Sequence, residues 1–405
     1  MPAMPDRASS RFLLPRARGD PRVEAELRRR IRAHGRITFA EFMDVALYLL
    51  DAGYYEAHVE LGRSGDFLTS PETHPVFGAL LARLALLMWR TLDSPRTFHI
   101  VEYGAGTGSL CRQLLEAAPR LDAQFASALR YQIVERSAFL RALQQAKLLD
   151  LVDRVIWVHP EQQPEPVVGC VIANEVADAL PVHRLCVTDG ELREVYVGVV
   201  ADRFIDLRGP FSRPELARYL SDEGVAPPEG STVEISLAAR DWLQDVSRRL
   251  ARGYHVTIDF GGEAPAIYGS ATPRGGLKCF HRHGWTDDPL DRPGLLDITA
   301  PVDCTNLKRI GAELGLALAS DTSQSEVLLS LGLGAALERL ERLGLPSQER
   351  QKNRIAMKAL ADPRGLGAYR VLIQARAASA FAFESEPLRG GWHALLPEEV
   401  PEWPR

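Results

Sequence analysis

Apolar residues in the N-terminal part of the chain recur at helical spacing. Between residues 23 and 51 they alternate with polar residues, and the triplet "HGR" at 34–36 interrupts the pattern, which predicts two amphipathic helices. The apolar run from 75 to 89 carries Arg83 and is too short to span a bilayer, so it predicts a buried helix.

Short runs rich in β-branched residues dominate the middle of the chain. Four of them lie at 98–103, 129–135, 154–159 and 167–173, with helical segments between them. This alternation is typical of buried parallel strands in βαβ units. Apolar runs at 254–259 and 368–377 predict two later strands. We therefore expect an α/β fold with a mostly parallel sheet.

Two other stretches show different patterns. In residues 182–200, Asp189-Gly190 separates two alternating apolar runs, a strong hairpin signal. We expect this hairpin to be an elaboration on the sheet. The stretch 306–360 is predicted to be largely helical.

Composition excludes several classes of protein. The 405 residues carry a formal net charge of −5, which gives no general footprint for nucleic acid. Five cysteines without a C-x-x-C pair indicate neither a disulfide framework nor a thiolate zinc site, and we expect no metal. We predict no membrane insertion and a cytoplasmic location, with the mitochondrial matrix as the alternative because the first 20 residues contain four arginines.

A glycine-rich loop follows the first predicted strand. Gly104, Gly106 and Gly108 allow the backbone to turn and approach a ligand closely, and the helix after them offers free N–H groups. Glu102 precedes the loop, and Glu135 ends the next strand, where a carboxylate can meet a ribose diol. The dinucleotide fingerprint requires a third glycine at 109, where this chain has serine. An NAD(P)-dependent oxidoreductase is therefore the disfavoured alternative.

The sequence "EYGAGTG" followed by an acid after the second strand resembles the class I S-adenosylmethionine-dependent methyltransferases. The segments "GYY" at 53–55, "GDFLTSPE" at 65–72, "ANEVADALPVHR" at 173–184, "VTIDFG" at 256–261 and "LLDITAPVD" at 295–303 resemble the MidA-like family, which includes complex I assembly factors that methylate a protein arginine. The resemblance implies a seven-stranded-type sheet, S-adenosyl-L-methionine as cofactor, and a protein substrate such as a respiratory complex subunit.

The same motifs supply the candidate site. We expect the cofactor to be bound by two groups of residues, Glu102, Gly104, Gly106, Gly108 and Glu135 of the sheet, and Asp66, Phe67, Thr69 and Ser70 of the covering loop. The loop has an alternative reading as a helix cap, because Ser70 precedes a proline.

The acceptor side is predicted from strand ends. Asn174 and Glu175 follow the fourth strand, and Asp259 ends a later one, so all three should face the ligand edge of the sheet. If the turn after 174 is helical, Glu175 and Asp178 share one face. Paired carboxylates suit a guanidinium, which has five donors and is always charged. We expect these four residues to be catalytic, with a solvated helix start as the alternative.

Together these predictions divide the chain into five parts. They are a flexible leader at 1–20, a helical cap with the covering loop at 21–95, a methyltransferase core with the inserted hairpin at 96–305, a helical insertion at 306–360, and the final strand or strands with a tail at 361–405. The predicted function is methylation of an arginine in a protein. A non-enzymatic assembly chaperone remains the second alternative.

Overall fold

A computed structural model describes residues 18–59, 69–270, 272–281, 284–379 and 395–396. Asp66 and Phe67 lie outside the described residues. Within these ranges no helix is both long and apolar enough to cross a membrane.

The main sheet has seven strands in the order β16-β17-β10-β5-β2-β3-β4. The strands are β2 (Phe98–Tyr103), β3 (Leu129–Val134), β4 (Val155–Val158), β5 (Val167–Asn174), β10 (Leu250–Asp259), β16 (Ala317–Ser323) and β17 (Arg370–Arg376). Only β17 runs antiparallel to its two neighbours, β10 and β16, while the other pairs are parallel. The prediction of a mostly parallel, seven-stranded-type sheet is confirmed.

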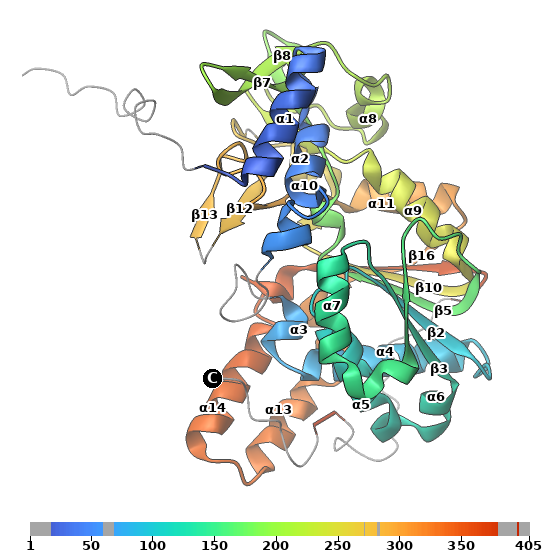
Figure 1. The fold of residues 1–405 in the computed structure, drawn as a ribbon. Coiled ribbons are helices and arrows are strands. Elements are labelled where there is room, and N and C mark those ends of the chain that lie inside the picture. The colour runs from blue at the N-terminus through green and yellow to red at the C-terminus, as the bar shows by residue number, and fades with distance from the viewer. Residues whose placement is uncertain (1–17, 60–68, 271, 282–283, 380–394, 397–405) are drawn as a thin grey trace, which may run out of the picture.

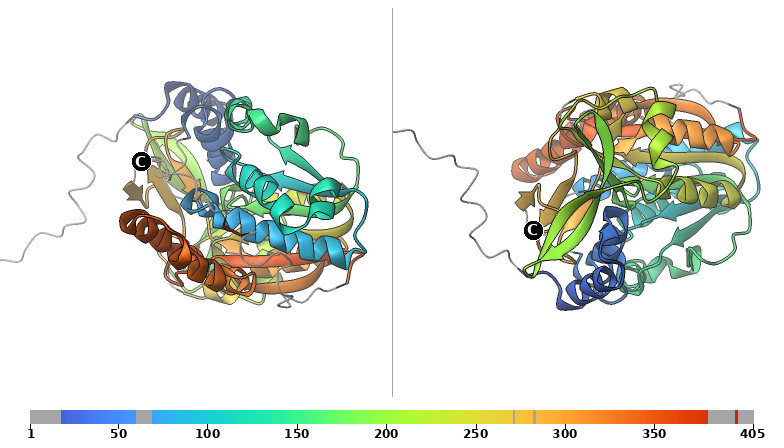
Figure 2. Two further views of the ribbon diagram at one scale, coloured as in Figure 1. Left: turned by 90° about the horizontal axis from the view of Figure 1, so that it is seen from below. Right: turned by 90° about the horizontal axis from the view of Figure 1, so that it is seen from above.

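Helices cover both faces of this sheet (Figures 1 and 2). Ile100 and Ile172 pack with α4 (Val76–Thr91) and α5 (Ser109–Leu121). Their neighbours Val101 and Val171 pack on the other face, with α9 (Ala238–Arg249) and α11 (Cys304–Glu313). Because successive strand residues point to opposite faces, apolar residues at both positions allow helices on both sides.

The stretch 306–360 contains a strand that the sequence pattern does not reveal. The C-terminal helices α12 (Gln324–Ser330), α13 (Leu333–Arg342) and α14 (Ser347–Ala359) follow β16, which is the edge strand of the main sheet. The β16 sequence "ALASDTS" is short, small and polar, and all its side chains are at least partly exposed. An edge strand of this composition lacks the apolar pattern by which strands are recognised.

A second, five-stranded sheet has the order β1-β7-β6-β9, with β8 paired to β7. Its strands are β1 (Ile37–Thr38), β6 (His183–Thr188), β7 (Glu191–Val200), β8 (Arg203–Gly209) and β9 (Thr232–Ile235). The predicted hairpin is β6–β7, and both Asp189 and Gly190 have positive φ, 56° and 73°, as a tight primed turn requires. It is not an elaboration on the main sheet, however, because its long strands pair with β1, β8 and β9 instead.

The two predicted N-terminal helices pack on this second sheet. They are α1 (Pro21–His34) and α2 (Phe39–Tyr48), and their apolar residues form a core with Val197 and Phe204 of β7 and β8. Figure 1 shows them with β7 and β8 at one end of the molecule.

The remaining elements are short. The other helices and helical turns are η2 (Tyr54–His58), α3 (Ser70–Thr73), α6 (Ala123–Ala128), α7 (Ala138–Lys147), η3 (Leu149–Arg154), η4 (Ala177–Ala179), α8 (Leu216–Asp222), α10 (Ala264–Tyr268) and η5 (Leu366–Ala368). Strands β12 (Lys278–His281), β13 (Gly284–Thr286) and β14 (Asp297–Thr299) form one small sheet, and β11 (Gly261–Gly262) pairs with β15 (Val302–Asp303).

Candidate active site

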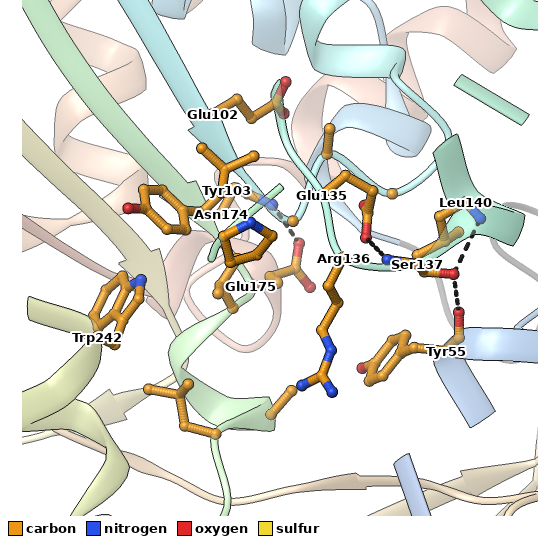
Figure 3. Close-up of a pocket in the computed structure, with 18 of the residues that line it drawn as sticks. Tyr55, Glu102, Tyr103, Glu135, Arg136, Ser137, Leu140, Asn174, Glu175 and Trp242 are labelled. Carbon is orange, nitrogen blue, oxygen red and sulfur yellow. Dashed lines mark hydrogen bonds between the residues drawn. The ribbon is translucent and has the colours of Figure 1, made fainter. Parts of the chain in front are cut away.

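A cavity of about 570 Å³ opens at the carboxyl ends of β2, β3 and β5. Its walls come from the segments that follow these strands, from Tyr48 and Tyr55 of the N-terminal part, and from α9. Figure 3 shows Glu135, Ser137 and Leu140 on one side of this cavity, Asn174 and Glu175 near its centre, and Trp242 on the far side. Ligands of open α/β sheets bind at this edge.

The glycine-rich loop turns with positive φ at all three predicted glycines, 61° at Gly104, 53° at Gly106 and 86° at Gly108. Gly104 and Gly106 line the cavity. A Cβ at Gly104 would lie 2.7 Å from the Val176 side chain, so both space and φ require glycine there. Gly108 does not line the cavity but caps the start of α5.

Glu135 is buried in the cavity wall, next to Val134 and Leu140. Its carboxylate accepts hydrogen bonds from the Ser137 backbone N–H at 2.8 Å and from the Gln144 side-chain amide at 2.9 Å. Burial raises the pKa of Glu135. A fixed carboxylate beside apolar side chains fits a ribose diol and an adjoining base, so this wall suits the nucleoside part of S-adenosylmethionine.

Glu102 lies at the base of the glycine loop and also lines the cavity. Its carboxylate accepts a hydrogen bond from the Tyr131 hydroxyl at 2.7 Å, and burial raises its pKa to about 8. This hydrogen bond joins β2 to β3 directly below the glycine loop, and support of the loop by Glu102 stays a prediction.

The covering segment contributes one residue that we predicted at the cavity and one that we missed. Thr69 lines the cavity, whereas Ser70 is fully buried and its hydroxyl donates to Gln324 at 3.0 Å. Glu72, the last residue of the "GDFLTSPE" motif, also lines the cavity. It accepts hydrogen bonds from the hydroxyls of Thr107 at 2.5 Å and Ser109 at 2.6 Å.

Lys147 completes this contact between the covering segment and the glycine loop. Its Nζ lies 3.6 Å from the Glu72 carboxylate and donates to the Thr107 hydroxyl at 2.8 Å and to the Ser109 hydroxyl. We call Glu72, Thr107, Ser109 and Lys147 the loop clasp. The motif pointed to the segment, but nothing in the sequence pairs Glu72 with positions 35 to 75 residues away.

Two tyrosines and an arginine form the wall near η2. Tyr48 and Tyr55 stack at 5.5 Å, and the Arg136 guanidinium lies 4.7 Å from the centre of the Tyr48 ring. The Tyr55 hydroxyl donates to Asp297 at 2.7 Å. The motifs "GYY" and "LLDITAPVD" are therefore in direct contact, which sequence order does not show.

Asn174 and Glu175 face the cavity, as predicted. Glu175 has a positive φ of 54°, and its Oε1 accepts hydrogen bonds from the Ser70 backbone N–H at 3.2 Å and the Asn174 amide at 3.0 Å. Burial raises the pKa of Glu175 to about 7. This carboxyl can therefore gain or lose a proton near neutral pH.

Asp178 and Asp259 are placed differently from our prediction. Glu175 lies outside the short 3₁₀ turn η4, so Glu175 and Asp178 do not share a helical face, and neither Asp178 nor Asp259 is among the cavity-lining residues. The Asp259 carboxylate instead accepts the backbone N–H groups of 176, 177 and 178 at 3.1, 2.9 and 3.2 Å. Asp259 thus fixes the turn that presents Glu175.

Helix α9 supplies a wall that the sequence analysis missed. Its cavity-lining residues are Ala238, Asp241, Trp242, Asp245 and Arg248. The Asp245 carboxylate accepts a hydrogen bond from the Tyr103 hydroxyl at 2.5 Å, and Arg249 donates to both. The spacing of three and four residues between these positions shows that they share one face of the helix. It does not show which part of the molecule that face contacts.

These observations define a class of enzyme. A glycine loop after the first core strand, an acid after the second, the "NE" pair after the fourth and one antiparallel strand in a seven-stranded sheet define a class I S-adenosylmethionine-dependent methyltransferase. A family model of S-adenosyl-L-methionine-dependent methyltransferases matches residues 80–321, and the chain belongs to this family.

Similar proteins agree with this assignment. A crystal structure of a Burkholderia thailandensis protein bound to S-adenosyl-homocysteine is 32% identical, with a TM-score of 0.79 over 89% of this chain and 94% of that chain. The protein arginine methyltransferase NDUFAF7 homolog of Drosophila melanogaster, named as mitochondrial, is 29% identical over 86% of this chain and 83% of its own length. The human protein arginine methyltransferase NDUFAF7 is 26% identical over 84% and 79%.

The cofactor is therefore S-adenosyl-L-methionine, and the enzyme is a methyltransferase. The oxidoreductase alternative is not favoured, and neither is a chaperone without activity. The MidA-like resemblance is confirmed.

Proposed function

We propose that this enzyme transfers the methyl group to a guanidinium nitrogen of an arginine in a protein partner. The observation that carries the proposal is the Glu175 carboxyl, which faces the cavity beside Asn174 with a pKa raised to about 7. A planar guanidinium is well matched by a carboxylate and an amide oxygen side by side. The names of the curated relatives, which are protein arginine methyltransferases, support the same acceptor.

Methyl transfer requires the protein mainly to position the acceptor nitrogen and the methyl group. The cofactor supplies a methyl group on a positively charged sulfur, and Glu175 holds the acceptor nitrogen in line with it. As the nitrogen–carbon bond forms, the carbon–sulfur bond breaks, its electron pair stays on sulfur, and one guanidinium proton passes to the Glu175 carboxylate. In this proposal Asp259 acts through the turn it fixes. Asp178 does not line the cavity, and burial raises its pKa well above the usual value, so it takes no part in the chemical step.

The partner that we propose rests on the family resemblance, and the names of the relatives support the compartment. By the family resemblance, a subunit of a respiratory complex is the acceptor that we propose. The curated relatives are named as mitochondrial, which supports the matrix alternative and gives the cytoplasmic prediction no support.

The test uses a peptide library with arginine at a fixed central position, and a matched library with lysine there. We expect the enzyme with S-adenosylmethionine to add methyl groups to the arginine library only, measured by mass spectrometry. Glu175→Gln should lower that rate at least about 100-fold, as loss of a positioned base does. It should leave S-adenosylhomocysteine affinity, measured by calorimetry, within about threefold, because Glu175 contributes to the chemical step rather than to cofactor binding. Methylation of the lysine library, or full activity in Glu175→Gln, would contradict the proposal.

A further inference from the structure

The α9 wall of the cavity lies on the side where the methyl acceptor must enter. Figure 3 places Asn174 and Glu175 between Trp242 on one side and Glu135, Ser137 and Leu140 on the other. If the nucleoside occupies the Glu135 wall, the transferred group points toward the centre. An in-line displacement requires the acceptor to come from the side opposite to the sulfur, which is the side of Trp242.

Trp242 is held in a defined orientation on this wall. Its indole is only 8% exposed. The Tyr103 ring meets it edge-on at 6.4 Å and the His255 ring at 5.3 Å. Aromatic contacts on two sides leave the indole little freedom to turn away from the cavity that it lines.

The indole N–H of Trp242 has no hydrogen-bond partner among the described residues. In Figure 3 the nitrogen lies at the edge of the ring that faces Asn174 and Glu175. Buried tryptophan N–H groups usually find a partner, and a buried donor without one is destabilising. A ligand with an acceptor atom at this position would supply the missing bond.

A second unpartnered atom lies across from it. The Asn174 amide nitrogen donates to Glu175, while its oxygen Oδ1 is buried and has no partner among the described residues. One acceptor and one donor, each buried in a residue that lines the cavity, are thus left without a partner among the described residues. An arginine residue within a polypeptide has the complementary groups, since its guanidinium only donates and its main-chain carbonyls accept.

We propose that the α9 wall is the docking site for the main chain of the acceptor polypeptide, with Trp242 Nε1 donating to a carbonyl oxygen that flanks the target arginine. This inference rests on the proposed function, because it takes a guanidinium at Asn174 and Glu175 as given. Asp241 and Glu161 are exposed carboxylates among the cavity-lining residues, and the one cation of the α9 lining, Arg248, is paired with Asp245 at 3.4 Å. The remaining negative charge favours a basic segment of the partner. Trp242 would thereby select arginine in a polypeptide over a free guanidine.

The experiment follows the Trp242 indole signal by NMR with two small acceptors. The protein is ¹⁵N-labelled at its six tryptophans and saturated with S-adenosylhomocysteine. One probe is Nα-acetyl-arginine methylamide, which has two carbonyls, and the other is butylguanidine, which has none. Trp242→Phe, or Trp242→Tyr if the first variant does not fold, assigns the signal by its disappearance. Trp89 is the matched control, because its indole already donates to the Pro95 carbonyl at 2.9 Å in the core.

We expect the Trp242 N–H signal to move downfield with the acetyl-arginine probe and not with butylguanidine, while Trp89 stays in place. In parallel, Trp242→Phe should raise KM for the acetyl-arginine probe about 3- to 10-fold more than KM for butylguanidine, as loss of one hydrogen bond does. An unmoved signal while both probes are methylated, or the same shift with both, would overturn the docking role alone. Failure of the wild-type enzyme to bind or methylate either probe would overturn the arginine acceptor itself.

Discussion

Glu175 shows how a single backbone angle sets the chemistry of this site. Its positive φ of 54° takes the chain out of β5 and turns the side chain into the cavity. Non-glycine residues rarely adopt this conformation, and where they do the cost is often borne at functional sites. Three backbone N–H groups bound to Asp259 hold the turn that follows. Strain and support together place a partly buried carboxyl where an acceptor can reach it.

The raised pKa of Glu175 makes a prediction about stability. Its pKa is about 7 in the folded protein, raised from 4.5 mainly by burial. The folded state therefore favours the protonated form. The protonated Glu175 carboxyl makes its full contribution to the free energy of unfolding below about pH 4.5, and this contribution is lost as the pH rises through 7. Glu175→Gln cannot ionise, so at pH 8 it should exceed the wild type in unfolding free energy by about 3 kcal/mol, and at pH 4.5 the difference should fall below about 0.5 kcal/mol.

Urea unfolding at the two pH values measures this difference. Glu161→Gln is the control, because that side chain also lines the cavity but is 90% exposed. A gain in Glu175→Gln that is equal at both pH values would show that ionisation of this carboxyl is not its cause. A residue that costs stability when charged fits a functional role.

At the scale of single residues, the sequence predicted positions better than orientations. Asn174 and Glu175 were found because the residues after a parallel strand lie at the ligand edge. Asp178 and Asp259 were placed in the same group, but the turn that takes them out of the cavity wall depends on hydrogen bonds from the backbone of 176–178 to the Asp259 carboxylate. Those contacts are long-range, so no local pattern encodes them.

The loop clasp is the feature of interest at the scale of elements. It connects α3, which contains the end of the "GDFLTSPE" motif, with the glycine loop and the end of α7. Glu72 is the common acceptor and lines the cavity. The clasp thus couples the position of α3 to the shape of the glycine loop.

Glu72→Gln should therefore weaken cofactor binding. The amide keeps one acceptor but loses the charge that attracts Lys147 and strengthens the hydroxyl bonds. Charge-assisted hydrogen bonds contribute about 1.5–3 kcal/mol, and with one neutral bond retained we expect a roughly fivefold rise in the Kd of S-adenosylhomocysteine, measured by calorimetry. The exposed Glu161→Gln variant should leave that Kd unchanged. Equal affinities of the wild type and Glu72→Gln would mean that the clasp is a surface contact without effect on the cofactor.

The strands and the hairpin differ in how well the sequence predicts them. The strands β2, β3 and β5 are short runs rich in apolar residues and were predicted within a residue or two. The hairpin turn was also correct, since Asp189-Gly190 determines it locally. The sheet to which the hairpin belongs could not be read from the same residues, because β1 pairs with β7 across more than 150 residues of chain.

At the scale of the whole molecule, the cavity joins two hydrophobic cores. Tyr103, Val134 and Trp242 belong to the core of the main sheet, while Tyr55 and Tyr48 pack with the core of the N-terminal helices and the second sheet. The loop segments at 104–107 and 135–137 connect the strands to this interface. A cofactor in the cavity would touch both parts.

Cofactor binding should therefore stabilise the molecule as one unit. Ligand at 100 times its Kd adds about 2.7 kcal/mol to the folded state. With an unfolding entropy of about 2.1 cal/mol/K per residue, that gain corresponds to a rise in Tm of roughly 3 °C for a chain of this length. S-adenosylhomocysteine should produce this rise in a single calorimetric transition, and NADH and NADPH should produce none, because Ser109 stands where the dinucleotide fingerprint has its third glycine. If calorimetry showed two unfolding transitions and S-adenosylhomocysteine raised the Tm of only one, the cofactor would bind the main sheet without the N-terminal part. In that case the contacts of Tyr48 and Tyr55 with the cavity would belong to acceptor binding alone.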